Sequence, residues 1–177
     1  MTTAYTRTAV ALHWLVAALV ITALTLGWSM TDMVLSPLKL RLFNWHKWVG
    51  VTVLALMFVR ALWRLTHRPP ALLPMPAWQR LASRLVHGLL YLMLLVQPLT
   101  GWIYSNASGI PIVYLGLIPL PNLVGKDKAL DIFVREIHDA GGWVLAVLIG
   151  LHLLAAIKHY YHDRDDTLGR MLRWQSS

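Results

Sequence analysis

Four long apolar stretches, separated by polar and proline-containing segments, dominate the pattern of this chain. They cover residues 10–30, 44–63, 85–104 and 137–156. Each has about the 20 residues that a helix needs to cross the hydrocarbon core of a bilayer. Helices also satisfy their own backbone hydrogen bonds, as lipid requires. The pattern predicts an all-α fold, an integral membrane four-helix bundle, with residues 1–177 forming a single transmembrane domain.

Two connections between these stretches are long and rich in proline. Residues 64–84 contain four prolines, so they cannot form one continuous helix, and we expect a short interfacial helix from about Trp78 into the third span. In the connection at 105–135, the apolar part at 110–123 is too short and too rich in proline to cross the bilayer. We expect this part to be a loop lying on the membrane surface.

Composition supports a membrane environment. Apolar residues make up 57% of the chain and charged residues 14%, whereas soluble domains carry about 25% charged residues. The formal net charge of +8 could indicate nucleic acid in a soluble protein. Here the charges lie between apolar runs, so membrane topology explains them and no nucleic-acid partner is expected. The absence of cysteine excludes disulfides, iron–sulfur clusters and covalent haem attachment.

Lysine and arginine are unevenly distributed between the two sides that four spans define. Ten lie on the side of the termini and the 64–84 connection, against six on the opposite side. Because basic residues are enriched in cytoplasmic segments, both termini are expected in the cytoplasm. The ten are Arg7, Arg60, Arg64, Arg68, Arg80, Arg84, Lys158, Arg164, Arg170 and Arg173; the six are Lys39, Arg41, Lys47, Lys126, Lys128 and Arg135.

Two histidines in the fourth span provide the clearest functional indication. Ionisable residues within spans are costly and usually functional. His138 and His152 are 14 residues apart, which leaves them about 40° from alignment on one helix face and about 21 Å apart along the axis. This spacing suits two stacked cofactors, one near each face of the membrane, close enough for electron transfer between large conjugated rings.

Each cofactor iron would need a second ligand at matching depth on another helix. The directions of the spans pair His13 with His152, and His46 with His138. Neutral imidazole is a good ligand of haem iron, so the pattern predicts two non-covalent, bis-histidine b haems. By depth alone His87 competes with His13, and we favour His13.

Other interpretations explain these residues less well. A single histidine in a span could be a hydrogen-bonded packing residue, but four at paired depths are hard to assign to packing. A metal cluster needs ligands within a few ångströms, and a proton path would be expected to have acidic residues inside the spans. Gly50 and Gly142 each follow a histidine by four residues and could admit a flat porphyrin, although helix packing uses glycine equally.

Several segments, in order along nearly the whole chain, resemble the bacterial cytochrome b561 family. They read ALHWLV, NWHKWVG, VRALWRL, HGLLYLMLLVQPLTG, REIHDAGGWVLAVLIGLHLLAAIKHYYH and DDTLGRMLRW. The resemblance implies a four-helix bundle with two b haems in the bacterial inner membrane. It also implies the ligand pairs His13 with His152 and His46 with His138, and it places His87 beside a haem or a quinone.

No flavin or nicotinamide motif is present, so substrates must reach the haems directly. The resemblance implies a membrane quinone, ubiquinone, as one partner. His159 or His87 could donate a hydrogen bond to a quinone carbonyl and deliver a proton; interfacial snorkelling is the alternative for the basic side chains nearby. Arg60 could pair with a haem propionate or anchor its helix at the headgroups.

The opposite face carries basic residues that could steer a small anion towards a haem edge. The resemblance implies superoxide as this anion, oxidised to oxygen while quinone is reduced; an ordinary solvated loop is the alternative. The main rival function is a cytochrome b subunit that anchors a soluble hydrogenase- or dehydrogenase-type partner, and a third is a haem-free transporter or sensor. The basic residues concerned are Lys39, Arg41, Lys126, Lys128 and Arg135.

Overall fold

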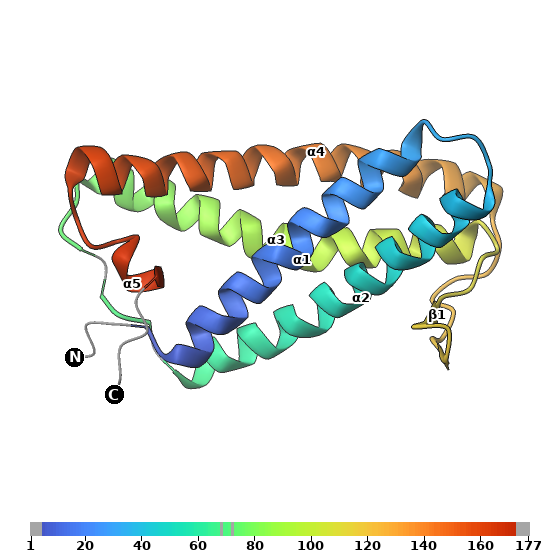
Figure 1. Ribbon diagram of the computed structural model, residues 1–177, viewed down its shortest axis with the longest axis horizontal. Coiled ribbons are helices and arrows are strands. Elements are labelled where there is room, and N and C mark those ends of the chain that lie inside the picture. The colour runs from blue at the N-terminus through green and yellow to red at the C-terminus, as the bar shows by residue number, and fades with distance from the viewer. Residues whose placement is uncertain (1–4, 68, 72, 173–177) are drawn as a thin grey trace.

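Four long helices form the molecule (Figure 1). The computed structural model describes residues 5–67, 69–71 and 73–172. The helices are α1 (Arg7–Thr31), α2 (Pro37–Thr66), α3 (Ala77–Ala107) and α4 (Lys128–Lys158). All four are long and apolar enough to cross a membrane. The all-α prediction of a membrane four-helix bundle is confirmed, and each expected span lies within one helix. Arg68 and Arg173, two of the charges used for orientation, lie outside the described residues.

Local sequence sets the beginning of three of these helices. The side chain of Thr6 accepts a hydrogen bond from the backbone N–H of Ala9 at the start of α1. Ser36 caps α2 in the same way, followed by a proline at the first helical position. Asp127 accepts two backbone N–H groups at the start of α4. Such caps satisfy donors that have no partner inside the helix.

The bundle consists of two helical pairs, with α1 packed along α2 and α3 along α4. The pairs meet most closely between α2 and α3. The core is a small cluster: Val16, Val20, Val53, Met57 and Leu145. Many large apolar side chains instead lie on the outer surface, as expected where the surrounding solvent is lipid.

The connection before the third span differs from expectation. Trp78 lies in the first turn of α3, which continues unbroken from Ala77 to Ala107. The expected short interfacial helix is therefore the beginning of α3 itself. The helix also continues through Pro98, although proline removes one backbone hydrogen bond.

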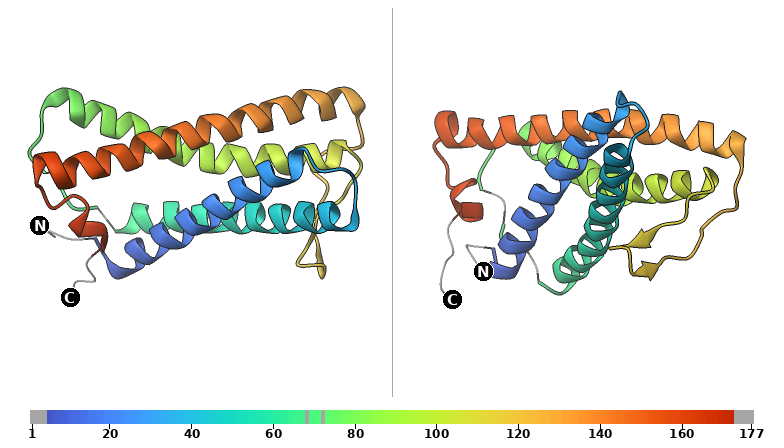
Figure 2. Two further views of the ribbon diagram at one scale, coloured as in Figure 1. Left: turned by 45° about the horizontal axis from the view of Figure 1, so that its top comes forward. Right: turned by 45° about the vertical axis from the view of Figure 1, so that its right-hand side comes forward.

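A short β-hairpin replaces the loop expected between the third and fourth spans. Strands β1 (Val113–Tyr114) and β2 (Ile118–Pro119) pair antiparallel. The turn between them has positive φ at Leu115 and Gly116, 53° and 73°, as in type I′ hairpins. The hairpin projects beside α2 (Figure 2), where the Trp48 indole donates to the Val113 carbonyl and Thr52 bonds the Tyr114 hydroxyl.

The C-terminal part folds back against the start of the chain (Figure 1). After α4 comes a π-helical turn, η1 (His159–Asp163), and then the short helix α5 (Gly169–Leu172). The Trp14 indole of α1 donates to the Met171 carbonyl, 2.8 Å away. Below, this end of the bundle is called the terminal end, and the opposite end, which carries the β-hairpin, is called the hairpin end.

Candidate functional site

His46 of α2 and His138 of α4 face each other at the hairpin end and are called the hairpin-end pair. Their ring centroids are 6.0 Å apart and their planes are inclined by 87°. A metal bound about 2 Å from each of two imidazole nitrogens separates the ring centroids by about 6 Å. The spacing of this pair fits one iron atom between the two rings.

Hydrogen bonds set the tautomer of both rings. Nδ1 of His46 lies 2.9 Å from the Ala23 carbonyl, which can only accept. Nδ1 of His138 lies 3.0 Å from Oγ1 of Thr100, whose own hydroxyl donates to the Gln97 carbonyl. Both Nδ1 atoms must therefore donate, which leaves each Nε2 with a lone pair for a metal. Such outer hydrogen bonds orient ligating histidines and raise their basicity.

A short segment of α3 surrounds His138. The Gln97 side-chain amide donates to the His138 carbonyl, 2.5 Å away. A Cβ atom added at Gly101 would lie 2.9 Å from Cε1 of the His138 ring. On the other ring, a Cβ atom at Gly27 would lie 3.2 Å from Cε1 of His46. The absence of side chains at these two glycines lets the neighbouring helices approach both imidazoles.

No sequence pattern points to these α3 residues individually. The available signal was a run of polar and small residues around a proline, QPLTG, inside an apolar span. Of the two glycines that were proposed, Gly50 faces open space and Gly142 would bring its Cβ 3.7 Å from Gln97. At a third glycine, Gly141, the helices do come close, since an added Cβ would clash with the Gln97 amide.

His13 of α1 and His152 of α4 face each other towards the terminal end and are called the terminal-end pair. Their ring centroids are 6.2 Å apart with planes inclined by 77°. Nδ1 of His13 is buried with no hydrogen-bond partner among the described residues. An unpartnered buried polar atom is costly, by about 1–3 kcal/mol. The spacing and the unpartnered nitrogen both fit residues that hold an iron.

His87 lies beside the same pair. Its ring centroid is 5.2 Å from that of His152, which is shorter than the roughly 6 Å of two imidazoles on one metal. Its Nδ1 lies 2.7 Å from the Ser83 carbonyl and donates to it. The structure thus brings together all three histidines expected at this depth.

Arg60 of α2 is close enough to the terminal-end pair for its charge to act on it. It interacts electrostatically with both His13 and His152. Its guanidinium lies 5.5 Å from the centre of the Tyr91 ring, and that of Arg64 lies at the same distance. A pocket at the terminal end is lined by both arginines and by Trp63. The positive charge next to the terminal-end pair suits a carboxylate such as a haem propionate.

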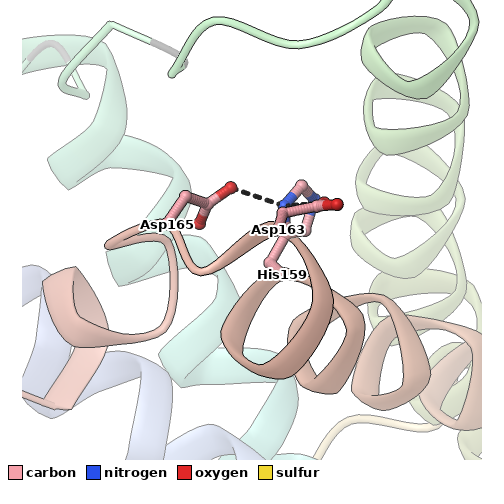
Figure 3. Close-up of side chains that lie close together, drawn as sticks. All are labelled: His159, Asp163 and Asp165. Atoms are coloured by element: carbon pink, nitrogen blue, oxygen red, sulfur yellow. Dashed lines mark hydrogen bonds and ion pairs between the residues drawn. The ribbon is translucent and has the colours of Figure 1, made fainter.

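His159 forms a second polar cluster at the terminal end, in the π-helical turn (Figure 3). Its Nδ1 lies 2.7 Å from Oδ2 of Asp165 and 3.1 Å from Oδ2 of Asp163. Lys158 binds Asp163 at 2.6 Å. The imidazole is largely covered, with 13% of its side chain exposed. His159 is thus held by carboxylates rather than loosely exposed at the surface.

Basic residues at the hairpin end are partly engaged in local contacts. The Lys39 ammonium donates to the Met33 carbonyl, 2.5 Å away. Arg135 pairs with Asp131 at 3.2 Å and lies over the Tyr104 ring. Lys126 packs its alkyl chain close to Gly109. The predicted basic patch is therefore weaker than the residue count suggested.

Known proteins are similar to this chain along nearly its whole length. The family model of prokaryotic cytochrome b561 matches residues 4–174. The chain is 34% identical to cytochrome b561 homolog 2 of Escherichia coli K12, over 94% of this chain and 90% of the relative. It is 31% identical to cytochrome b561 homolog 1 of the same organism, over 95% and 96%. It is 29% identical to the probable superoxide oxidase CybB of Yersinia pestis, over 95% of each chain.

Proposed function

Because the chain belongs to the prokaryotic cytochrome b561 family, we propose that it transfers electrons across the membrane, from a donor at the hairpin end to a quinone at the terminal end. The family implies haem b, and two imidazole pairs of matching geometry support two haems per chain. Each bound haem supplies a one-electron iron couple. The observation that carries the proposal is the spacing of 6.0 and 6.2 Å within the two pairs.

The proposed ligands are His46 with His138, and His13 with His152. The first pair is supported by two Nδ1–H groups that already have acceptors. For the second, the distances favour His13 over His87, whose ring lies too close to His152 for one iron between them. His87 would then lie beside a haem held by that pair. An iron held by two such histidines would not readily bind oxygen, which suits electron transfer.

Arg60 is proposed to bind a propionate of the haem at the terminal end. Its positive charge acts on both histidines of that pair. A guanidinium can hold a carboxylate by two parallel hydrogen bonds. Gly50 and Gly142 are proposed to face the haem at the hairpin end, and the open space at Gly50 supports the first.

His159 is proposed to donate a proton to the quinone. It follows His152 by seven residues, so both lie nearly on one face of the helix, about 10 Å apart along its axis. In the protonated ring, Nδ1–H donates to Asp165 and Nε2–H remains for a quinone carbonyl. Reduction to the quinol takes two electrons and two protons. His87, at the same end, is a further candidate for contact with the quinone.

The proposed donor is superoxide. The Yersinia pestis relative bears the name of a probable superoxide oxidase, and four exposed basic residues lie at the hairpin end: Arg41, Lys126, Lys128 and Arg135. Two superoxide ions would give two oxygen molecules and the two electrons that one ubiquinone needs. In the proposed orientation the hairpin end faces away from the cytoplasm and both termini face the cytoplasm of a bacterial inner membrane.

A pyridine haemochrome assay on purified protein, with spectra before and after superoxide is added, tests this function. We expect two b haems per chain, reduced by superoxide and reoxidised by ubiquinone. Haems that superoxide does not reduce would refute the proposed enzymatic activity. They would favour a subunit that anchors a soluble redox partner. In a second arm, His159→Gln should retain both haems but reoxidise slowly with quinone; unchanged kinetics would remove His159 from the site.

A further inference from the structure

The backbone after α4 returns Asp165 to the ring of His159. The helix ends in a π-helical turn, after which Arg164 has a left-handed conformation with φ of 51°. This conformation is uncommon outside glycine. The N–H groups of Arg164 and Asp165 both point at the His159 carbonyl. Single π-helical turns are frequent at functional sites, and here the turn brings a carboxylate next to an imidazole.

The Asp165 carboxylate is fixed at both of its oxygen atoms. Oδ2 lies 2.7 Å from Nδ1 of His159, and Oδ1 accepts the backbone N–H of Thr167 at 2.8 Å. Burial alone would raise the pKa of Asp165, but hydrogen bonds from Thr167 and His159 outweigh it and hold that pKa below its usual value. The group is therefore an ionised acceptor at neutral pH, and it has one orientation.

Asp163 differs from Asp165 in its main partner. Both of its oxygens bind the Lys158 ammonium, at 2.8 and 2.6 Å. Its contact with His159 is longer, 3.1 Å against 2.7 Å. Lys158 compensates the charge of Asp163, so Asp165 is the carboxylate that acts mainly on the imidazole. The two aspartates thus form a matched pair for comparison.

We propose that Asp165 is a positioning residue for His159: its carboxylate holds the proton on Nδ1, so that Nε2 is the nitrogen that exchanges a proton with the quinone. The inference rests on the proposed quinone reduction. In each transfer the Nε2–H bond breaks, the proton goes to a quinone oxygen, and solvent returns a proton to Nε2. Asp165 stays ionised throughout, as a carboxylate that orients a histidine does elsewhere.

Asp165→Asn is the informative substitution. The asparagine keeps its shape and can still accept the Thr167 N–H, but its amide then presents a donor to Nδ1. Nδ1 must become the acceptor, so the neutral ring carries its proton on Nε2. Nε2 then has no lone pair with which to take up a proton from solvent. We expect kcat for quinone reduction to fall about 10- to 100-fold with KM little changed, because proton transfer is affected more than binding. Asp165→Glu should restore part of the rate.

The matched comparison is Asp163→Asn, which removes the longer of the two contacts with His159 and should lower kcat much less than Asp165→Asn does. Haem content and reduction by the donor should be the same in all variants. Nitrogen NMR of His159 in detergent gives a second readout: the neutral ring should carry Nδ1–H in the original protein and Nε2–H in Asp165→Asn. The original protein alone tests this point, even if a variant fails to fold.

The outcomes separate the two proposals. If His159→Gln is slow while Asp165→Asn is as fast as the original protein, the role of Asp165 is refuted and the quinone site stands. If His159→Gln has no effect, the quinone site itself is refuted. An Nε2–H tautomer in the original protein, or an equal loss in Asp163→Asn, would also refute the role given to Asp165.

Discussion

Replacing Gly101 by alanine tests how α3 shapes the hairpin-end pair. The added Cβ would lie 2.9 Å from Cε1 of His138, and 3.4 and 3.5 Å from its two nitrogens. Cβ contacts shorter than 3.0 Å are essentially never seen. Because the neighbour is a ring held by Thr100 and not the end of a flexible chain, the imidazole itself must move, by about 0.5 Å or more, to reach ordinary contact.

The expected cost follows from this overlap. One extra methyl group in a tightly packed site destabilises by about 1–3 kcal/mol. If the imidazole is a haem ligand, this strain lowers the affinity for that haem by about 5- to 150-fold, since every 1.4 kcal/mol changes a binding constant tenfold. Displacement of the ring also strains the hydrogen bond to Thr100, so we expect a loss of haem affinity near the upper end of this range.

Transfer of haem to an excess of apomyoglobin measures the effect, with redox titration to identify the haem that remains. Gly101→Ala should release the haem of the hairpin-end pair faster and keep the other. The control is Gly88→Ala on the same helix, where the new Cβ meets no atom within 4 Å. Equal release from the two variants would refute the reasoning, and so would loss of the other haem.

Three further predictions concern single side chains. His46→Ala and His138→Ala should each remove the same haem, measured by haemochrome content and redox titration; loss of the other haem from either variant would contradict the pairing. Thr100→Val should keep that haem but raise its midpoint potential, because Nδ1–H of the ligand loses its acceptor and the imidazole becomes a weaker donor; an unchanged potential would exclude the hydrogen bond. Arg164→Gly should stabilise the protein by about 1 kcal/mol, since it relieves a left-handed residue; a lower melting temperature in the same detergent would contradict this.

The helices were predictable because lipid imposes one simple rule on sequence. A span must be apolar for about 20 residues, and this signal does not depend on how the helices pack. Chain direction then fixes the depth of each histidine, which is why His13 and His152, from opposite ends of the sequence, could be paired beforehand. The structure places them 6.2 Å apart, although their role as ligands stays a prediction.

The contacts around the histidines could not be predicted in the same way. Thr100 and Gly101 reach His138 only because α3 and α4 have one particular relative rotation, and no sequence period records that rotation. The β-hairpin has strands of two residues each, too short for an alternating pattern. The return of Asp165 to His159 depends on a π-helical turn and on an arginine in the left-handed conformation, and local propensity predicts neither of them.

The division of the bundle into two helical pairs bears on how the protein is assembled in the cell. Each pair is an antiparallel unit that can enter the bilayer as it leaves the ribosome, and among the described residues the fully buried core that joins the two halves is a small cluster. In both histidine pairs one histidine comes from the first half and the other from the second. Iron bound there would tie the halves together as a crosslink does, so a shortage of haem during synthesis would leave two inserted but unjoined halves open to membrane proteases.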